Sequence, residues 1–156
     1  MAKKSSPQRQ HEFDVAYMKM AIAMSELSYA QRKKVGCIIV SAEDQVISQG
    51  FNGTPSGMDN CCEETLPDGT LKTYPWVLHS EANAITKCAK YSSTTKGATV
   101  YVTLSPCIEC SKLIIQAEIE RVVYLEDYRD NSGLNLLRQC GITVEKLTGL
   151  LQIKEK

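Results

Sequence analysis

The second half of the chain alternates short helical segments with short β-branched segments, and this alternation restricts the fold more than any other feature of the sequence. The predicted order is helix 80–90, strand 99–103, helix 106–117, strand 121–125, helix 134–139 and strand 142–146. Right-handed crossovers between successive strands place helices on both faces of one sheet. The alternation therefore predicts an α/β fold.

The first half adds one helix and one hairpin to this pattern. The apolar residues that recur at helical spacing, and so predict an amphipathic helix of about four turns, are Phe13, Tyr17, Met20, Met24 and Leu27. Segments 35–40 and 45–50, joined by a turn at 42–44, predict two paired strands. Together the segments predict a three-layer α/β/α sandwich with a mixed sheet of about five strands.

Two stretches lack a hydrophobic period. Residues 1–10 are polar and basic, and we expect them to form a flexible lead-in to a single domain at 11–156. Residues 50–57 hold three Gly and one Pro, and the loop that they begin continues to about Val77. A loop of this length in a compact domain is usually functional or flexible.

Composition excludes several classes of protein. The chain of 156 residues carries 18 basic and 18 acidic side chains, and its ten aromatic residues are one Trp, seven Tyr and two Phe. Zero net charge argues against an extended nucleic-acid-binding surface, which needs an excess of basic side chains. No apolar stretch is long enough to span a membrane, and no signal peptide is visible. Seven Cys favour thiols and metal ligands over disulfides, so we expect a cytoplasmic protein.

One constellation of residues carries metal-binding chemistry. Cys107 and Cys110 lie three residues apart at a predicted helix start, where both sulfurs can reach one ion. His79, at the start of another predicted helix, supplies a third ligand. One imidazole and two thiolates select zinc over magnesium or calcium. Three protein ligands with one open position are typical of a catalytic zinc site.

Glu81 follows the histidine ligand by two residues, so its carboxylate can reach a zinc-bound water without coordinating the metal. Zinc lowers the pKa of bound water to about 7, and a nearby carboxylate can take up the released proton. This arrangement predicts a hydrolytic site. The alternative is a structural zinc clip, but such sites normally have four protein ligands and do not need the glutamate.

The pattern His-x-Glu followed by Pro-Cys-x-x-Cys resembles the zinc-dependent nucleobase deaminases. The loop Gly50-Phe51-Asn52-Gly53-Thr54-Pro55-Ser56-Gly57, together with Asn83 after the glutamate, resembles the deoxycytidylate deaminases more closely. The matching segments cover most of residues 35–141. The resemblance implies a cytidine-deaminase-like fold and hydrolysis of dCMP to dUMP and ammonia, which supplies dUMP for thymidylate synthesis.

The resemblance also implies roles for individual residues. Asn52 would hold the sugar 3′-hydroxyl; the alternative is a turn residue that tolerates a left-handed backbone. Ser80 replaces an Ala of many relatives and should fit beside the substrate. The Ser105 backbone carbonyl would accept a hydrogen bond from the substrate amine, and Tyr128 would pack near the substrate. We also expect Ser105 to cap the helix that begins at Pro106.

Relatives of this kind also suggest assembly and regulation. We expect a homo-oligomer, by resemblance a homohexamer, since the first helix offers an apolar face. We expect dCTP to activate and dTTP to inhibit, with magnesium on the effector phosphates. Backbone N–H groups at Gly53 and Gly57, with Asn60 nearby, could form the effector nest. The alternative is a plain structural turn.

Several readings stay open on the sequence alone. The substrate could be another cytosine compound, such as deoxycytidine, dCTP or single-stranded nucleic acid, and the chain could be a non-catalytic zinc scaffold that binds nucleotides. A second zinc at Cys61 and Cys62 is not expected, because no His lies between His11 and His79. We expect core positions for Cys37, Cys88 and Cys140. The cations that could bind a substrate phosphate are Lys33, Lys34, Lys87, Lys90, Lys112 and Arg129.

Overall fold

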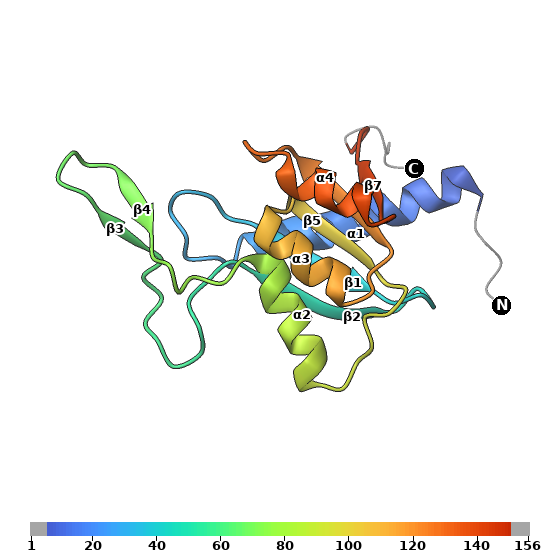
Figure 1. Ribbon diagram of the computed structural model, residues 1–156, viewed down its shortest axis with the longest axis horizontal. Helices are drawn as coiled ribbons and strands as arrows, with labels where there is room; N and C mark the ends of the chain where they lie inside the picture. The colour runs from blue at the N-terminus through green and yellow to red at the C-terminus, as the bar shows by residue number, and fades with distance from the viewer. Residues whose placement is uncertain (1–5, 151–156) are drawn as a thin grey trace.

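The computed structural model describes residues 6–150 and contains a mixed five-stranded sheet with strand order β2-β1-β5-β6-β7 (Figure 1). The elements are α1 (Pro7–Ser25), β1 (Gly36–Val40), β2 (Val46–Phe51), β3 (Glu63–Thr65), β4 (Leu71–Thr73), α2 (Ser80–Lys90), β5 (Thr99–Leu104), α3 (Ile108–Gln116), β6 (Arg121–Glu126), α4 (Ser132–Gln139) and β7 (Thr143–Lys146). β1 pairs antiparallel with β2 and β5, whereas β5, β6 and β7 are parallel. The predicted α/β fold and the mixed sheet are confirmed.

Helices cover both faces of the sheet and bury a hydrophobic cluster on each (Figure 1). Successive residues of the central strand β1 point to opposite faces. Cys37 and Ile39 therefore join the cluster under α2, α3 and α4, while Ile38 and Val40 join the cluster under α1. The three-layer α/β/α arrangement follows from this division of the core.

Helix α1 begins earlier than the sequence pattern indicates. Ser6 is the N-cap and its hydroxyl accepts a hydrogen bond from the Arg9 backbone N–H at 3.3 Å, while Pro7 occupies the first helical turn. This capping chemistry starts the helix before the apolar period becomes visible. Residues 7–10 are thus helical rather than a flexible lead-in, and residues 1–5 lie outside the described part of the chain.

The buried face of α1 also differs from the predicted one. Phe13, Met20 and Leu27 are 37%, 41% and 56% exposed. The residues of the helix that are buried are Asp14, Val15, Tyr17, Met18 and Ala21. Two apolar stripes compete on this helix, and the stripe that faces the sheet contains an aspartate, which hydropathy alone assigns to solvent.

Asp14 is buried because an ion pair attaches α1 to the sheet. Arg121 of β6 donates to both carboxylate oxygens of Asp14, at 2.8 and 2.7 Å, and the Tyr101 hydroxyl donates to the same carboxylate at 2.7 Å. Burial acts to raise the pKa of Asp14, but these hydrogen bonds outweigh it and hold the pKa below its usual value. The network stabilises the contact between helix and sheet.

The long segment predicted as loop contains a two-stranded hairpin, β3–β4, that projects from the side of the sheet (Figure 1). Each strand has only three residues, and Glu63, Glu64 and Lys72 among them give no hydrophobic alternation. The turn is closed by Asp68, whose carboxylate accepts from the Thr70 backbone N–H at 2.9 Å. The sequence pattern is too short and too polar to reveal these strands.

The remaining differences are smaller. Cys37 and Cys88 are buried, as expected, whereas Cys140 is exposed and the expectation of a core position is wrong. Cys140 follows the last residue of α4, and the buried face of that helix is carried by Leu134 and Leu137. Within residues 6–150, no helix is long and apolar enough to span a bilayer.

Candidate active site

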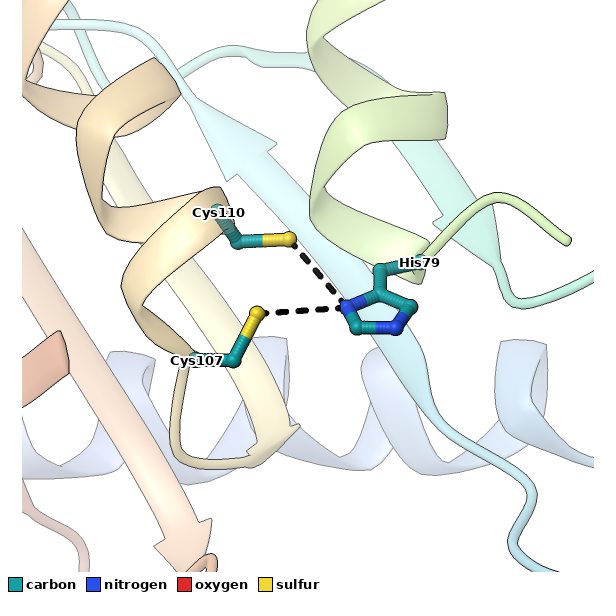
Figure 2. Close-up of side chains that lie close together, drawn as sticks. All are labelled: His79, Cys107 and Cys110. Carbon is teal, nitrogen blue, oxygen red and sulfur yellow. Dashed lines mark hydrogen bonds between the residues drawn. The ribbon is translucent and has the colours of Figure 1, made fainter. Parts of the chain in front are cut away.

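Three potential metal ligands meet where α2 and α3 begin (Figure 2). His79 Nδ1 lies 3.4 Å from Cys107 Sγ and 3.5 Å from Cys110 Sγ, and all three ligand atoms lie within 4.8 Å of one another. Within the described residues the cluster has these three members, which leaves one position of a tetrahedral zinc site open. The structure brings together the ligands that the sequence spacing selects.

The backbone explains why these side chains can act as ligands. His79 and Cys107 are the N-cap residues of α2 and α3, and both have extended backbone angles with no side-chain capping bond. Their side chains are therefore not engaged in closing the helix. Cys110 lies in the first turn of α3, so its sulfur faces the same point.

Helix α3 begins at Ile108, not at Pro106, and the prediction that Ser105 caps this helix is wrong. The Ser105 hydroxyl instead accepts a hydrogen bond from the Tyr128 backbone N–H at 2.7 Å. The end of β5 is thereby joined to the segment after β6. The local sequence suited a cap, but a partner 23 residues away uses the hydroxyl.

Two glycines let neighbouring backbone approach the starts of these helices. A Cβ atom on Gly50, in β2, would lie 2.4 Å from the carbonyl oxygen of Ser80. A Cβ atom on Gly133, in α4, would lie 2.2 Å from the carbonyl oxygen of Pro106 and 2.7 Å from the carbonyl carbon of Cys107. Neither distance allows a side chain, because the opposing atoms are backbone. Both helix starts that carry ligands are therefore held by direct backbone contact.

Hydrogen bonds within the cluster shift the pKa values of the two thiols in opposite directions. The hydrogen bonds with Cys110 and His79 lower the pKa of Cys107 to about 3. The hydrogen bond with Cys107 and burial raise the pKa of Cys110, and the hydrogen bond with Cys107 also raises the pKa of His79. The lowered pKa of Cys107 favours its thiolate, which is the form that binds metal. One imidazole nitrogen and two sulfurs fit zinc, which these three residues would hold.

Glu81 lies beside this cluster, almost fully buried at 4% exposure. Burial raises the pKa of its carboxyl group, and the Ser80 hydroxyl donates a hydrogen bond to Oε2 at 3.0 Å. The position next to a potential metal ligand and the restricted solvent access suit a residue that takes up and returns a proton. Ser80 itself is completely buried and orients this carboxylate.

The cluster opens into a cavity of about 600 Å³. The residues singled out from the sequence that line this cavity are Asn52, His79, Ser80, Glu81, Ser105, Cys107 and Tyr128. The structure therefore places two of the three expected metal ligands, the expected proton carrier and the four expected substrate residues around one space, while Cys110 is buried behind its wall. Of the six cations that could bind phosphate, Lys33 and Arg129 line the cavity.

The expected effector residues lie elsewhere. The backbone N–H of Gly53 donates to the Leu78 carbonyl at 3.1 Å, and the Leu78 N–H donates back to Gly53 at 2.8 Å. This pairing occupies the N–H that was expected to face an effector phosphate. Gly57 and Asn60 are exposed and are not among the residues that line the cavity.

Sequence reasoning missed several residues of the cavity wall, among them the polar residues Arg32, Glu63 and Thr73. Glu63 and Thr73 come from the hairpin that the hydrophobic pattern did not reveal. Arg32 adjoins two lysines in the run Arg32-Lys33-Lys34, so its charge was visible. No signal in the sequence indicated that Thr73, on the unpredicted hairpin, accepts a hydrogen bond from the Arg32 side chain.

The fold and the site together define a class of protein: a zinc-dependent hydrolytic enzyme of the nucleobase-deaminase type. Residues 11–126 match the family of the cytidine and deoxycytidylate deaminase zinc-binding region, and the chain belongs to the cytidine and deoxycytidylate deaminase family. The resemblance seen in the sequence motifs is confirmed.

Individual relatives agree with this assignment. The chain is 36% identical to the deoxycytidylate deaminase of Mus musculus over 148 residues, which covers 88% of this chain and 80% of the mouse protein. It is 37% identical to ComE operon protein 2 of Bacillus subtilis over 135 residues, 84% of this chain and 69% of that protein. The dCMP deaminase of cyanophage S-TIM5, solved in complex with dCMP and dUMP, superposes with a TM-score of 0.80 at 43% identity, covering 92% and 99% of the two chains. The cytidine-deaminase-like fold is thereby confirmed.

Proposed function

We propose that this protein is a zinc-dependent deaminase that hydrolyses dCMP to dUMP and ammonia and so supplies dUMP for thymidylate synthesis. The observation that carries the proposal is the buried carboxylate of Glu81 beside the His79, Cys107 and Cys110 cluster, at the wall of one cavity. Similarity to proteins named deoxycytidylate deaminase, and to a phage enzyme solved with dCMP and dUMP, supports dCMP as the substrate.

His79, Cys107 and Cys110 would hold a zinc ion, which would supply an activated water and stabilise negative charge on oxygen during hydrolysis. The protein groups do the proton work. Glu81 takes a proton from the attacking water as its oxygen bonds to carbon C4, and delivers this proton to ring nitrogen N3. It then passes the proton of the new C4 hydroxyl to the exocyclic amine, the C4–N bond breaks, and ammonia leaves while the C4 carbonyl forms. Ser80 holds the Glu81 carboxylate through the 3.0 Å hydrogen bond. Burial keeps competing water away from this proton path.

We assign the remaining cavity residues to substrate positioning. The Ser105 carbonyl accepts from the substrate amine, Tyr128 packs against the nucleotide, and Asn52 binds the sugar 3′-hydroxyl. The Asn52 amide already bridges the backbone of Lys33 and Val35, at 2.8 Å each. Within the described residues, the Nδ2 group keeps one free N–H and Oδ1 keeps one free lone pair. The bridge therefore fixes the Asn52 side chain while leaving it able to bind a ligand.

The proposal is tested by measuring ammonia release from zinc-loaded protein with dCMP, deoxycytidine, dCTP and a short single-stranded DNA. We expect the highest kcat/KM with dCMP. A higher kcat/KM for another cytosine compound would show that this compound, and not dCMP, is the preferred substrate. Bound zinc without ammonia release from any of them would favour the alternative, a nucleotide-binding zinc scaffold.

We also propose a cytoplasmic homohexamer regulated by dCTP and dTTP. The exposed apolar side chains of Phe13 and Met20 on α1, and of Leu27 just after it, support assembly, because exposed apolar surface is typical of protein interfaces. Light scattering tests the assembly, and a monomeric active enzyme would contradict it.

Effector binding with magnesium is assigned to the exposed loop around Gly57 and Asn60. Kinetics with sub-saturating dCMP in the presence of each triphosphate test this regulation. Kinetics that neither dCTP nor dTTP alters would contradict it.

A further inference from the structure

We propose that Ser28 and Asn83 are positioning residues that hold Asn52 in place for the substrate sugar; this inference rests on the proposed function. Asn52 lines the cavity directly after β2, whereas Ser28 and Asn83 are not among the residues that line it. A residue just beyond the end of a strand keeps one conformation only where its backbone has partners, because fixing free backbone costs about 1–2 kcal/mol per residue. Ser28 and Asn83 supply such partners from two other elements of the fold.

Ser28 holds the backbone of Asn52 from the segment that follows α1. Its hydroxyl donates a hydrogen bond to the Asn52 carbonyl oxygen at 2.7 Å and accepts one from the Ala30 backbone N–H at 3.2 Å. The Ser28 residue is only 3% exposed. A buried hydroxyl that both donates and accepts has a fixed orientation, and removing it leaves a carbonyl and an N–H without this partner. Ser28 therefore fixes the place where the Asn52 side chain leaves the backbone.

Asn83 holds the neighbouring peptide group from helix α2. It lies two residues after Glu81, and its Nδ2 group donates a hydrogen bond to the Phe51 carbonyl oxygen at 3.0 Å. The carbonyl groups of two consecutive residues, Phe51 and Asn52, are thus bound by side chains from two different elements. The helix that begins next to the metal ligand His79 therefore also sets the position of the residue proposed to bind the sugar.

Every polar group of Asn52 has a partner in the fold. Its backbone N–H donates to the Val35 carbonyl at 3.2 Å, its carbonyl accepts from Ser28, and its side-chain amide bridges Lys33 and Val35. A sugar hydroxyl can donate to the amide oxygen and accept from the amide nitrogen, because each can form more than one hydrogen bond. A ligand that meets a group fixed in this way need not order it on binding, which favours affinity and discrimination against a sugar that lacks the hydroxyl.

The test is steady-state kinetics of the zinc-loaded enzyme with dCMP and with its 3′-deoxy analogue, the dideoxycytidine monophosphate that lacks only the sugar 3′-hydroxyl. We expect the wild-type enzyme to prefer dCMP by about tenfold or more in kcat/KM. Ser28→Ala and Asn83→Ala should each raise the KM for dCMP about three- to tenfold and change kcat by less than about twofold, because Asn52 must then be ordered on binding. The KM for the analogue should stay within about twofold, since it has no hydroxyl for Asn52 to bind. The preference for dCMP therefore shrinks in both variants.

Ser25→Ala is the matched control, because the Ser25 hydroxyl also donates to a backbone carbonyl, that of Ile22 in its own helix at 2.6 Å, and Ser25 does not line the cavity. It should leave the kinetics with both nucleotides unchanged. The inference is overturned if Ser28→Ala and Asn83→Ala keep the wild-type preference for dCMP, or if they impair both nucleotides equally, which would show a general structural role.

The wild-type enzyme separates this failure from that of the proposed function. An enzyme that deaminates dCMP and its 3′-deoxy analogue equally well would contradict the assignment of the sugar hydroxyl to Asn52, and the inference with it. An enzyme that deaminates neither nucleotide would contradict the proposed function itself.

Discussion

The two ends of the cavity are built by different means. At the metal end, the ligands come from two helix starts that glycines bring into backbone contact with neighbouring elements. At the open end, the wall is made of residues 31–35, a polar hairpin and the segment after β6, joined by individual hydrogen bonds. The metal end is close-packed, and short sequence motifs fix the positions of its ligands. The open end instead depends on hydrogen bonds between segments that are distant in the sequence. We infer that chemistry depends on the first and substrate selection on the second.

The largest expected effect is loss of the metal end itself. Cys110→Ala leaves two protein ligands, which cannot hold a catalytic ion well, so we expect loss of both bound zinc and activity for every cytosine substrate. Elemental analysis of the purified variant measures zinc per chain. Retention of one zinc per chain would show that the ligand set is wrong.

A second change tests whether close packing matters at the metal end. Gly133→Ala would gain up to about 1 kcal/mol in helix propensity, but its Cβ would meet backbone atoms that cannot move aside easily. We expect a net destabilisation of about 1–3 kcal/mol and weaker zinc binding. Urea unfolding and competition with a zinc chelator measure these effects.

Asn135→Ala is the control for this change, since Asn135 is exposed on the same helix. It should alter neither property. Unchanged zinc affinity in Gly133→Ala would show that α4 does not position Cys107.

A third change, remote from both ends, should affect stability and leave kinetics unchanged. Asp14→Asn weakens the ion pair with Arg121 and should lower the free energy of unfolding by about 2–3 kcal/mol at neutral pH. Because the pKa of Asp14 is depressed in the folded protein, its contribution is complete above the unfolded value near 3.8 and is lost as the pH falls through the folded value. The difference in stability between wild type and variant should therefore shrink below about pH 4.

Urea unfolding of the two proteins from pH 3 to 7 checks this expectation. A difference that stays constant over the whole range would mean that the charge of Asp14 is not what stabilises the helix–sheet contact. A change in the KM for dCMP would show that the sheet face under α1 is coupled to the cavity.

The contrast between the two ends also explains what the sequence could predict. His79, Glu81, Cys107 and Cys110 act through short spacings that fix their relative positions on helices, so the motif alone located them. The mixed sheet could be predicted because segments with helical spacing of apolar residues alternate with short β-branched segments. Arg32 could not be located in this way, because its orientation depends on a hairpin more than 30 residues later.

The errors have the same origin. Ser105 suited a helix cap, but a backbone N–H from a distant segment uses its hydroxyl. The apolar stripe of Phe13 and Met20 suited a core, but the partner of Asp14 on β6 turned the other face inward. In each case a tertiary contact overrode a sound local signal.

The most direct test of the central claim is dCMP turnover and zinc content of Glu81→Gln measured together. This variant keeps the shape of the buried side chain and the three metal ligands while removing the proton acceptor. We predict one zinc per chain, an unchanged unfolding midpoint and a kcat lowered by about 100- to 10,000-fold. A folded, zinc-loaded Glu81→Gln enzyme that turns over dCMP within about threefold of the wild-type rate would contradict the account.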